Sequence, residues 1–264
     1  MPYLFDDLDA VEASLRRSPF GLITDVDGTI SRIAPSPGEA RVDDGCRQQL
    51  SILVKRISLV AVISGRPAAE ARDMLGIDGV VYIGNHGLER LHGGNIELVH
   101  GAEEYPSMVA KMQVDVERLI RREGVFIENK GSALAIHYRN CNDTDRARGE
   151  ILHRLGELDL SQRFSIVEGR MVIELRPLLD IDKGTAVEKL IEDFQLQGGV
   201  YMGDDISDID AFRAARRRGL LAVSVASDEA PPDLAQASDY AVNGVAEVAR
   251  FLKWLASAFP ASVQ

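Results

Sequence analysis

Short, continuously apolar segments of this sequence run directly into polar residues, and this arrangement restricts the fold more than any other feature. Residues 21–24 read GLIT and are followed at once by Asp25 and, two positions later, by Asp27. Residues 59–63 read LVAVI and are followed by Ser64. Strands that are apolar on both faces and alternate with helices indicate a parallel sheet that is covered by helices on both sides.

The same alternation continues along most of the chain. Residues 44–57 show the helical spacing of apolar side chains, at Leu50, Leu53, Val54 and Ile57. We therefore expect an α/β protein with a Rossmann-like parallel-sheet core. The other expected core elements are helices at 1–18, 68–76, 184–196 and 208–219, a closing helix around Trp254, and strands at 79–87, 199–205, 220–226 and 239–243.

The pattern changes between residues 105 and 178, where the order becomes helix, strand, strand, helix, strand, strand (αββαββ). This order favours an antiparallel sheet with helices on one face. We therefore interpret residues 105–178 as an inserted α+β domain, and residues 1–104 and 179–264 as the two parts of the core domain. The expected elements of the insert are helices at 105–124 and 143–158 and strands at 125–130, 132–139, 164–168 and 171–175.

The net charge of the chain disfavours two classes of binding partner. Thirty Lys and Arg residues against 41 Asp and Glu residues give a net charge of −11. A surface of this sign repels nucleic acid and anionic lipid, so we expect neither nucleic acid nor a membrane as a partner. A phosphorylated small molecule stays compatible with the charge, because a bound cation inverts the local field.

The cysteines and the N-terminal residues indicate the cellular compartment in which the protein is expected. The two cysteines, Cys46 and Cys141, lack CxxC spacing, which favours a reducing compartment over a disulfide framework or a zinc site. The N-terminal residues carry acids where a secretory signal needs bases, and no apolar stretch reaches membrane-spanning length. We therefore expect a cytoplasmic protein, and we expect it to be a monomer.

Polar groups from four distant segments are expected at one edge of the sheet. In an open parallel sheet, ligands bind outside the carboxyl ends of the strands. Neighbouring carboxylates repel each other there unless a cation lies between them, and Mg²⁺ prefers oxygen ligands. The groups expected at this edge are Asp25 and Asp27, Ser64, Lys183, and Asp204 with Asp205. The Mg²⁺ ligands would be Asp25, the backbone carbonyl of Asp27, and Asp204.

This arrangement predicts phosphoryl-transfer chemistry. Asp25 would attack phosphorus with its second carboxylate oxygen. Asp27 would protonate the departing sugar oxygen and then deprotonate the attacking water. Lys183 and Ser64 would neutralise and hold the remaining phosphoryl oxygens.

Each motif alone also has a plainer structural explanation. An Asp-x-Asp-Gly sequence is commonly a turn, and a serine such as Ser64 often caps a helix. The acids of GDDISDIDAF, residues 203–212, suit a helix N-terminus. It is the combination of the four segments in sheet order that favours an enzyme.

With these segments in hand, the sequence resembles the haloacid-dehalogenase-like phosphatases and, within them, the trehalose-6-phosphate phosphatases. DVDGT at 25–29, SGR at 64–66, Lys183 and GDDISD at 203–208 look like the four motifs of the superfamily. The resemblance covers residues 20–225 and implies that the insert is the larger α/β cap of this family. It also implies that Mg²⁺ is the cofactor.

Three further stretches are similar to motifs of the narrower family: GNHGLE at 84–89, ENKGSALAIHYR at 128–139 and EGRMVIELRP at 168–177. For Glu128 and Lys130 the plainer alternative is an exposed strand position, and for His86 a loop histidine with satisfied hydrogen bonds. The resemblance implies substrate-binding roles for Gly65, Arg66, His86, Glu89, Glu128, Lys130, Arg139, Arg170 and Glu174. It implies metal-binding roles for Asp25, Asp27, Asp204, Asp205 and Asp208, of which Asp205 and Asp208 would bind the ion either directly or through the surrounding shell.

The resemblance finally implies a reaction. Trehalose 6-phosphate would be hydrolysed to trehalose and phosphate through an aspartyl-phosphate, as the final step of trehalose biosynthesis and in functional connection with a trehalose-phosphate synthase. One alternative keeps the chemistry but takes another phosphosugar, such as sucrose-phosphate or a glycosyl-phosphoglycerate. The other is a non-catalytic regulatory subunit that binds a sugar phosphate, against which the intact Asp25, Asp27, Lys183 and Asp204 argue.

Overall fold

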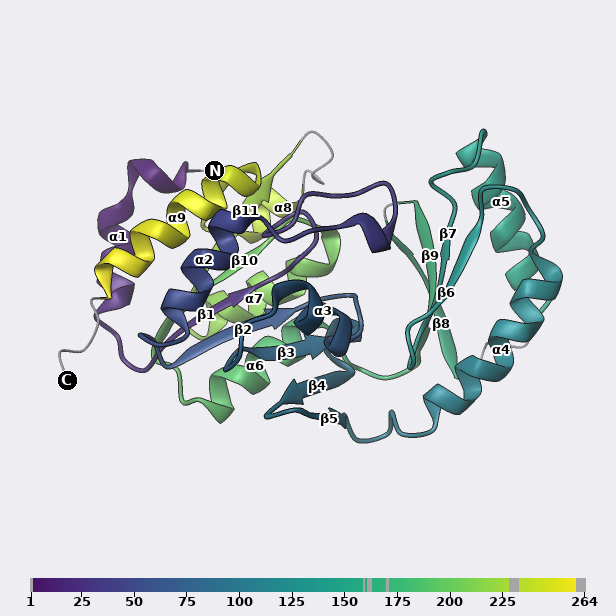
Figure 1. Ribbon diagram of the computed structural model, residues 1–264, viewed down its shortest axis with the longest axis horizontal. Coiled ribbons are helices and arrows are strands. Elements are labelled where there is room, and N and C mark those ends of the chain that lie inside the picture. Colours follow the sequence, from purple (N-terminus) through teal and green to yellow (C-terminus); the bar gives the residue numbers. More distant parts are fainter. Residues whose placement is uncertain (1, 159, 161–162, 170, 228–232, 260–264) are drawn as a thin grey trace. The chain divides into compact units, whose positions relative to one another are not determined.

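The computed structural model describes residues 2–158, 160, 163–169, 171–227 and 233–259 (Figure 1). The chain divides into a core unit, Met1–Glu97 with Ile181–Gln264, and an inserted unit, Leu98–Asp180. Over the residues that are described, none of the helices combines the length and the apolar character that crossing a membrane requires.

An eight-stranded sheet forms the centre of the core unit, and its strand order is β12-β11-β10-β1-β2-β3-β4-β5. The strands from β12 to β3 pair in parallel, whereas β4 pairs with β3 in antiparallel orientation. All residues of β1, β2 and β10 are buried, which explains why these segments are continuously apolar. The strands are β1 (Phe20–Thr24), β2 (Leu59–Ile63), β3 (Val81–Gly84), β4 (Glu89–His92), β5 (Asn95–Leu98), β10 (Gly198–Gly203), β11 (Leu221–Ala226) and β12 (Tyr240–Asn243).

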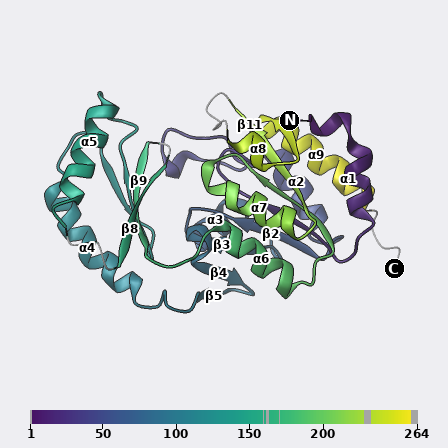
Figure 2. The same cartoon turned by 180° about the vertical axis from the view of Figure 1, so that it is seen from behind.

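Helices cover both faces of this sheet, as the two opposite views show (Figures 1 and 2). On one face, the apolar cluster joins Leu22, Val60 and Tyr82 to four helices. On the other, it joins Ile23, Ala61 and Tyr201 to three helices. The helices of the first face are α1 (Leu8–Leu15), α2 (Asp44–Leu53), α3 (Ala68–Leu75) and α9 (Gly244–Ala258), and those of the second are α6 (Lys183–Asp193), α7 (Ile209–Arg217) and α8 (Leu234–Ala237).

The expected α/β class is confirmed, but the sheet is longer than the sequence predicts. The strands β4 and β5 were not expected, because ERLH and NIEL are neither continuously apolar nor strictly alternating. They occupy one edge of the sheet, and β5 is exposed except at its last residue. Edge strands bury little side-chain surface, so their sequences carry a weak pattern. Over its described residues, the core unit also contains short 3₁₀ turns at Leu4–Asp6, Pro37–Glu39, Asn85–Gly87 and Ile206–Asp208.

The inserted unit is a four-stranded antiparallel sheet with the order β6-β7-β9-β8 and two helices. Its chain order is the expected αββαββ. The helices and one sheet face share an apolar core that includes Val109, Leu134, Ile151 and Ile173. The elements are α4 (Tyr105–Leu119), β6 (Phe126–Asn129), β7 (Leu134–His137), α5 (Thr144–Leu155), β8 (Phe164–Gly169) and β9 (Val172–Pro177).

Candidate active site

The carboxyl ends of the central strands bring the first expected residues together. Strands β1 and β10 pair in register, with Thr24 opposite Met202. The pairing continues one residue further, where the Asp25 backbone N–H donates to the Met202 carbonyl at 2.9 Å. Asp25 and Asp204 therefore leave the sheet from adjacent strands. This is the edge at which ligands of open α/β sheets bind.

Three carboxylates form a buried cluster at this edge, which we call the acid cluster: Asp25, Asp204 and Asp208. Each of them offers an oxygen that lies within 4.8 Å of those of the other two. Lys183, the first residue of α6, places its Nζ 2.7 Å from an oxygen of Asp25 and 2.7 Å from an oxygen of Asp208. Three formal negative charges thus face one positive charge in a site that is closed to solvent.

The electrostatics of the acid cluster are unbalanced. Burial raises the pKa of Asp25 well above its ordinary value, and the charges of Asp208 and Asp204 add to this effect while Lys183 opposes it. Burial acts to lower the pKa of Lys183, but Asp208 and Asp25 outweigh it and the pKa is raised, so Lys183 is a cation. A surplus of buried negative charge is costly unless a proton or a cation neutralises it. The donor set, which consists of carboxylate oxygens, fits a hard divalent cation.

Gly28 permits the close approach of the first loop to the acid cluster. Its φ of 89° lies in the left-handed region, and a Cβ at this position would lie 2.0 Å from an Asp204 oxygen. Only a residue without a side chain therefore fits between the β1 loop and this carboxylate. The next residue, Thr29, donates its hydroxyl to the other Asp204 oxygen at 3.4 Å.

Asp208 organises the loop after β10. One of its oxygens accepts from Lys183 at 2.7 Å and from the Tyr201 hydroxyl at 2.6 Å. The other accepts from the backbone N–H groups of Asp204 and Asp205, both at 2.9 Å. Asp205, expected as a further metal ligand, caps the 3₁₀ turn with its side chain and is not part of the acid cluster.

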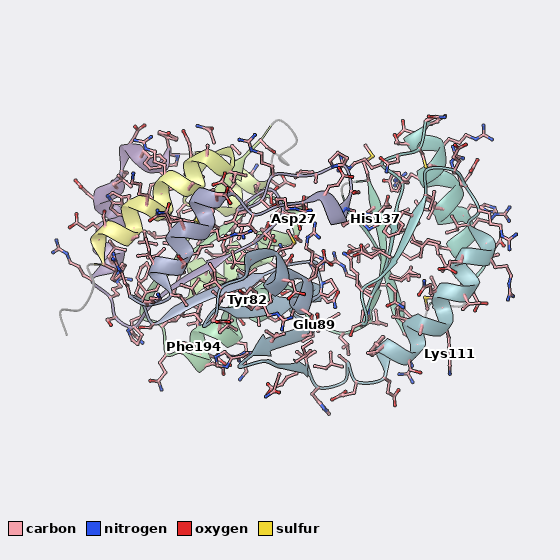
Figure 3. The ribbon with its side chains drawn as sticks, in the orientation of Figure 1. Asp27, Tyr82, Glu89, Lys111, His137 and Phe194 are labelled. Carbon is pink, nitrogen blue, oxygen red and sulfur yellow. The ribbon has the colours of Figure 1, made fainter. Side chains whose placement is uncertain are left out.

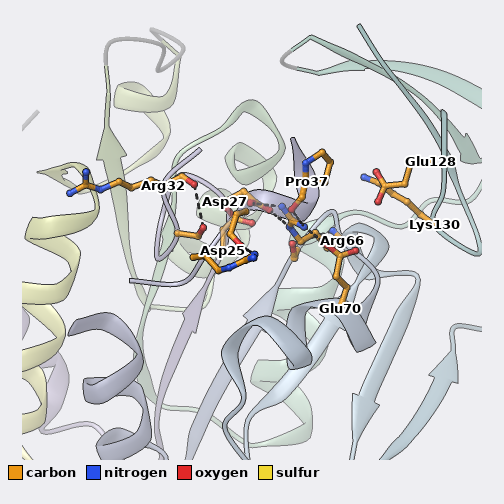
Figure 4. Close-up of polar contacts among 12 residues, drawn as sticks. Asp25, Asp27, Arg32, Pro37, Arg66, Glu70, Glu128 and Lys130 are labelled. Carbon is orange, nitrogen blue, oxygen red and sulfur yellow. Dashed lines mark hydrogen bonds and ion pairs between the residues drawn. The ribbon is translucent and has the colours of Figure 1, made fainter. Parts of the chain in front are cut away.

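Asp27 and Arg66 form a bidentate ion pair (Figure 4). Arg66 donates from Nε to one Asp27 oxygen at 2.6 Å and from Nη2 to the other at 2.9 Å. Arg66 also contacts Glu70 and donates to the Pro37 carbonyl at 3.0 Å. Burial acts to lower the pKa of Arg66, but the hydrogen bonds and charges of Asp27 and Glu70 outweigh it and the pKa is raised. The sequence had predicted a metal-binding or acid–base role for Asp27 and a substrate-binding role for Arg66; the structure shows these two residues bound to each other.

The loop after β2 and the loop after β3 are held against each other. Ser64 is buried, accepts from the Arg66 N–H at 3.1 Å through its hydroxyl, and accepts from the His86 N–H at 2.9 Å through its carbonyl. A Cβ on Gly65 would lie 2.6 Å from the His86 ring. Asn85 and His86 have φ values of 49° and 58°, a strained conformation for residues with side chains. Strain of this kind concentrates at functional loops.

Glu89, which Figure 3 labels, lies at the start of β4, is buried and caps a helix of the core unit. Its carboxylate accepts from the backbone N–H of Ala68 at 2.6 Å, at the first residue of α3. Helix α3 has no capping side chain of its own, because Pro67 precedes it. Burial raises the pKa of Glu89, although the hydrogen bonds from Ala68 and Asn85 lower it. These contacts give Glu89 a structural role beside the substrate-binding role that the resemblance implies.

Polar residues of the inserted unit form a second group, which we call the paired cluster: Glu128, His137, Lys130, Glu174 and Arg176. Glu128 and Glu174 both lie opposite Ala135 in the strand register and so share the sheet face that is not packed on the helices. Glu128 is 2.7 Å from the His137 ring nitrogen. Glu174 accepts from Lys130 at 2.7 Å and from Arg176 at 2.7 Å.

The predicted substrate-binding residues of the inserted unit differ in burial. Lys130 is buried and Glu128 is half-buried, so the plainer interpretation of these two residues as exposed strand positions is wrong. Glu174 is buried as well. Arg139 follows β7 and is half-buried. Arg170 lies outside the described residues, so its predicted role stays a prediction.

Sequence reasoning missed Tyr201, Thr29, His137 and Arg176. Each of them contacts a predicted residue through a hydrogen bond or ion pair. A signal was present for Tyr201, which puts a hydroxyl in an otherwise apolar strand. A signal was also present for His137, because it lies two residues after Ala135 on the same expected strand. The side chains of these two residues therefore lie on the same face of the sheet.

A parallel sheet covered on both faces, with a buried lysine and an acid cluster at its carboxyl edge, defines a haloacid-dehalogenase-like fold. The chain matches the family model described as trehalose-phosphatase over residues 23–246, and it belongs to that family. The resemblance found in the sequence is confirmed.

Named relatives agree with this family assignment, and a solved structure shares the fold. The trehalose-phosphate phosphatase of Mycobacterium avium (strain 104) is 34% identical over 242 residues, which cover 88% of this chain and 61% of the relative. That of Mycobacterium tuberculosis (strain ATCC 25618 / H37Rv) is 31% identical over 263 residues, covering 97% and 66%. The chain thus spans less than two thirds of the length of these relatives. The C-terminal domain of C. albicans trehalose-6-phosphate phosphatase shares the fold, with a TM-score of 0.82 at 20% identity, over 97% of this chain and 98% of that one.

Proposed function

We propose that the protein hydrolyses trehalose 6-phosphate to trehalose and phosphate, the final step of trehalose biosynthesis. The observation that carries this proposal is the buried acid cluster with Lys183 at the carboxyl edge of the sheet. Its relatives in the trehalose-phosphatase family bear the name of this activity. Membership of the family supports this substrate over sucrose-phosphate or a glycosyl-phosphoglycerate.

Mg²⁺ is the proposed cofactor, because the acid cluster combines oxygen donors with a surplus of negative charge. Asp25, Asp204 and the backbone carbonyl of Asp27 would hold the ion. Asp208 would act from the surrounding shell, since four donors already engage its two oxygens. Asp205 would do the same from the capped turn. When bound, the ion supplies positive charge that neutralises the phosphoryl oxygens.

Asp25 is the proposed nucleophile. A bond forms between its carboxylate oxygen and phosphorus while the bond from phosphorus to the sugar oxygen breaks. Asp27 donates a proton to the departing sugar oxygen, which requires its carboxyl to exchange the contact with Arg66 for one with the substrate. Asp27 then takes a proton from water, the water oxygen attacks phosphorus, and phosphate leaves with Asp25 restored.

Lys183 and Ser64 are the proposed partners of the other phosphoryl oxygens. Lys183 is fixed by two ion pairs and carries three N–H donors, so one donor remains for the phosphoryl group. Preorganised charge of this kind is the main means of stabilising the phosphoryl-transfer transition state.

The inserted unit is the proposed cap and sugar-recognition domain, with residues 105–178 as its expected extent. Glu128, Lys130, Arg139 and Glu174 would recognise the sugar hydroxyls, which both donate and accept hydrogen bonds. On the core unit, Gly65, Arg66, His86 and Glu89 would line the substrate site. The protein is further proposed to be a monomer that acts in the cytoplasm. Its substrate would be supplied by a trehalose-phosphate synthase.

Phosphate release from trehalose 6-phosphate tests this function directly. The protein is assayed with MgCl₂, with a chelator, and with sucrose 6-phosphate and a glucosyl-phosphoglycerate in place of the substrate. We expect release from trehalose 6-phosphate that the chelator abolishes. Faster release from another phosphosugar would replace the substrate, and tight binding of trehalose 6-phosphate without release would indicate a regulatory subunit.

A further inference from the structure

The hydroxyl of Tyr201 is a buried polar group directly beneath the acid cluster. Tyr201 lies in β10, two residues before the end of that strand, and its side chain is closed to solvent. Its ring packs edge-on against Phe212 of α7, with centroids 5.5 Å apart. Its hydroxyl donates to Asp208 at 2.6 Å. Burial raises the pKa of Tyr201 well above its ordinary value, and the charge of Asp208 adds to this, so the hydroxyl keeps its proton and acts as a donor.

The Asp208 oxygen that accepts from Tyr201 is the same one that holds Lys183. Lys183 in turn holds Asp25 at 2.7 Å with another of its N–H groups. The chain of contacts therefore runs from Tyr201 through Asp208 and Lys183 to the proposed nucleophile. Hydrogen bonds to a charged group are stronger than neutral ones, so each link fixes the direction of the next.

We propose that Tyr201 is a positioning residue for the reaction: its hydroxyl fixes Asp208 so that Lys183 is shared between Asp208 and Asp25. This inference rests on the proposed function. Without the hydroxyl, the oxygen of Asp208 keeps only the ammonium as a side-chain partner, and that carboxylate draws Lys183 away from Asp25. The ammonium of Lys183 is then displaced from the position in which it would bind the phosphoryl oxygens. The groups that are proposed to recognise the sugar keep their positions.

Tyr82 provides a matched control in the same sheet. It lies in β3, is as buried as Tyr201, and donates its hydroxyl to the Ile77 carbonyl at 2.8 Å (Figure 3). Its ring faces the opposite helix layer and has no contact with the acid cluster. Tyr82→Phe removes the same atom from the same kind of environment, so it reports what the loss of a buried hydroxyl does to stability alone.

The experiment compares Tyr201→Phe and Tyr82→Phe with the unchanged protein, using kcat and KM for trehalose 6-phosphate and the melting temperature. Tyr201→Phe is expected to lower kcat about tenfold with KM nearly unchanged, since a lost bond to a charged group costs one to two powers of ten. Tyr82→Phe is expected to leave both constants unchanged. Assays are run at least 15 °C below the lowest melting temperature, so that both variants are folded.

The outcomes separate the inference from the function on which it rests. An unchanged protein that releases no phosphate from any phosphosugar overturns both. An active unchanged protein with a normal kcat in Tyr201→Phe overturns the role of Tyr201 alone. Equal losses of kcat in the two variants, matched by equal losses of melting temperature, also overturn it, because they assign the effect to general destabilisation.

Discussion

The acid cluster of the core unit and the paired cluster of the inserted unit are both groups of charged side chains, but they differ in burial and in charge balance. The acid cluster is closed to solvent, whereas Glu128, His137 and Arg176 of the paired cluster are half-buried. The acid cluster has three carboxylates and one ammonium. In the paired cluster, Glu174 has two cations, Lys130 and Arg176, and Glu128 has His137. A site with surplus negative charge is completed by a cation, whereas a balanced site offers donors and acceptors to a neutral polyol. This difference matches the proposed division of roles, with metal and phosphate chemistry in the core unit and sugar recognition in the inserted unit.

The largest expected effect comes from removing the proposed nucleophile. Asp25→Asn is expected to lower kcat at least 1,000-fold, roughly the effect that loss of a nucleophile has in other enzymes. The melting temperature should hold or rise, because the change removes one of the surplus buried charges. Phosphate release and thermal unfolding are measured on the same preparation. Substantial remaining activity would reject Asp25 as the nucleophile and with it the catalytic half of the comparison.

The second effect concerns the cation that the acid cluster is expected to bind. A ligand at 100 times its Kd stabilises a protein by about 2.7 kcal/mol, which raises the melting temperature of a chain of this size by roughly 5 °C. We expect MgCl₂ to give such a rise, Asp204→Asn to abolish it, and Asp205→Asn to reduce it only in part. An equal rise in Asp204→Asn would place the ion elsewhere.

The third effect tests the paired cluster. Glu128→Gln is expected to raise KM for trehalose 6-phosphate about tenfold and to change kcat less, because it would weaken the charged hydrogen bond that Glu128 is proposed to make to the sugar. Glu168→Gln is the matched control: Glu168 lies in β8 of the same unit and pairs with Arg148 at the surface. The control should behave like the unchanged protein. A rise in KM in both variants would mean that the inserted unit responds to charge in general.

The smallest effect concerns Glu89, a buried acid of the core unit outside the acid cluster. Its pKa in the folded protein is raised, so its ionisation opposes folding; this cost is present above the folded pKa and absent below the ordinary value near 4.5. Glu89→Gln should therefore be more stable at pH 7 by at most about 1 kcal/mol, and the gain should vanish at pH 4.

Urea unfolding at the two pH values measures this gain, with Glu97→Gln as an exposed control on β5. A variant that is less stable than the unchanged protein at pH 7 would show that the charge of Glu89 strengthens its cap on α3. In that case a buried carboxylate of the core unit would stabilise the fold without a cation. Surplus buried negative charge would then no longer be an argument that the acid cluster binds a metal ion.

Much of the fold could be predicted from local patterns in the sequence. The α/β class, the αββαββ order of the insert and the strand-end positions of Asp25, Ser64 and Asp204 all follow from apolar periodicity and from motifs. The edge strands β4 and β5 did not, because half-exposed strands have no strict pattern. The pairing of Asp27 with Arg66 was equally out of reach, since 39 positions separate the two residues and their contact depends on how two loops meet.

The amino-acid order alone specifies which chemical groups are present and at which strand ends they leave the sheet. Burial on both faces forces continuous apolar strands, and the chain must then place its acids where those strands stop. How these groups share charge depends on the folded chain: Asp208 accepts from Lys183, Tyr201 and two backbone N–H groups at once, and Glu89 caps a helix. Hydrogen bonds between side chains depend on distances of a few tenths of an ångström, which strand register and helix packing set.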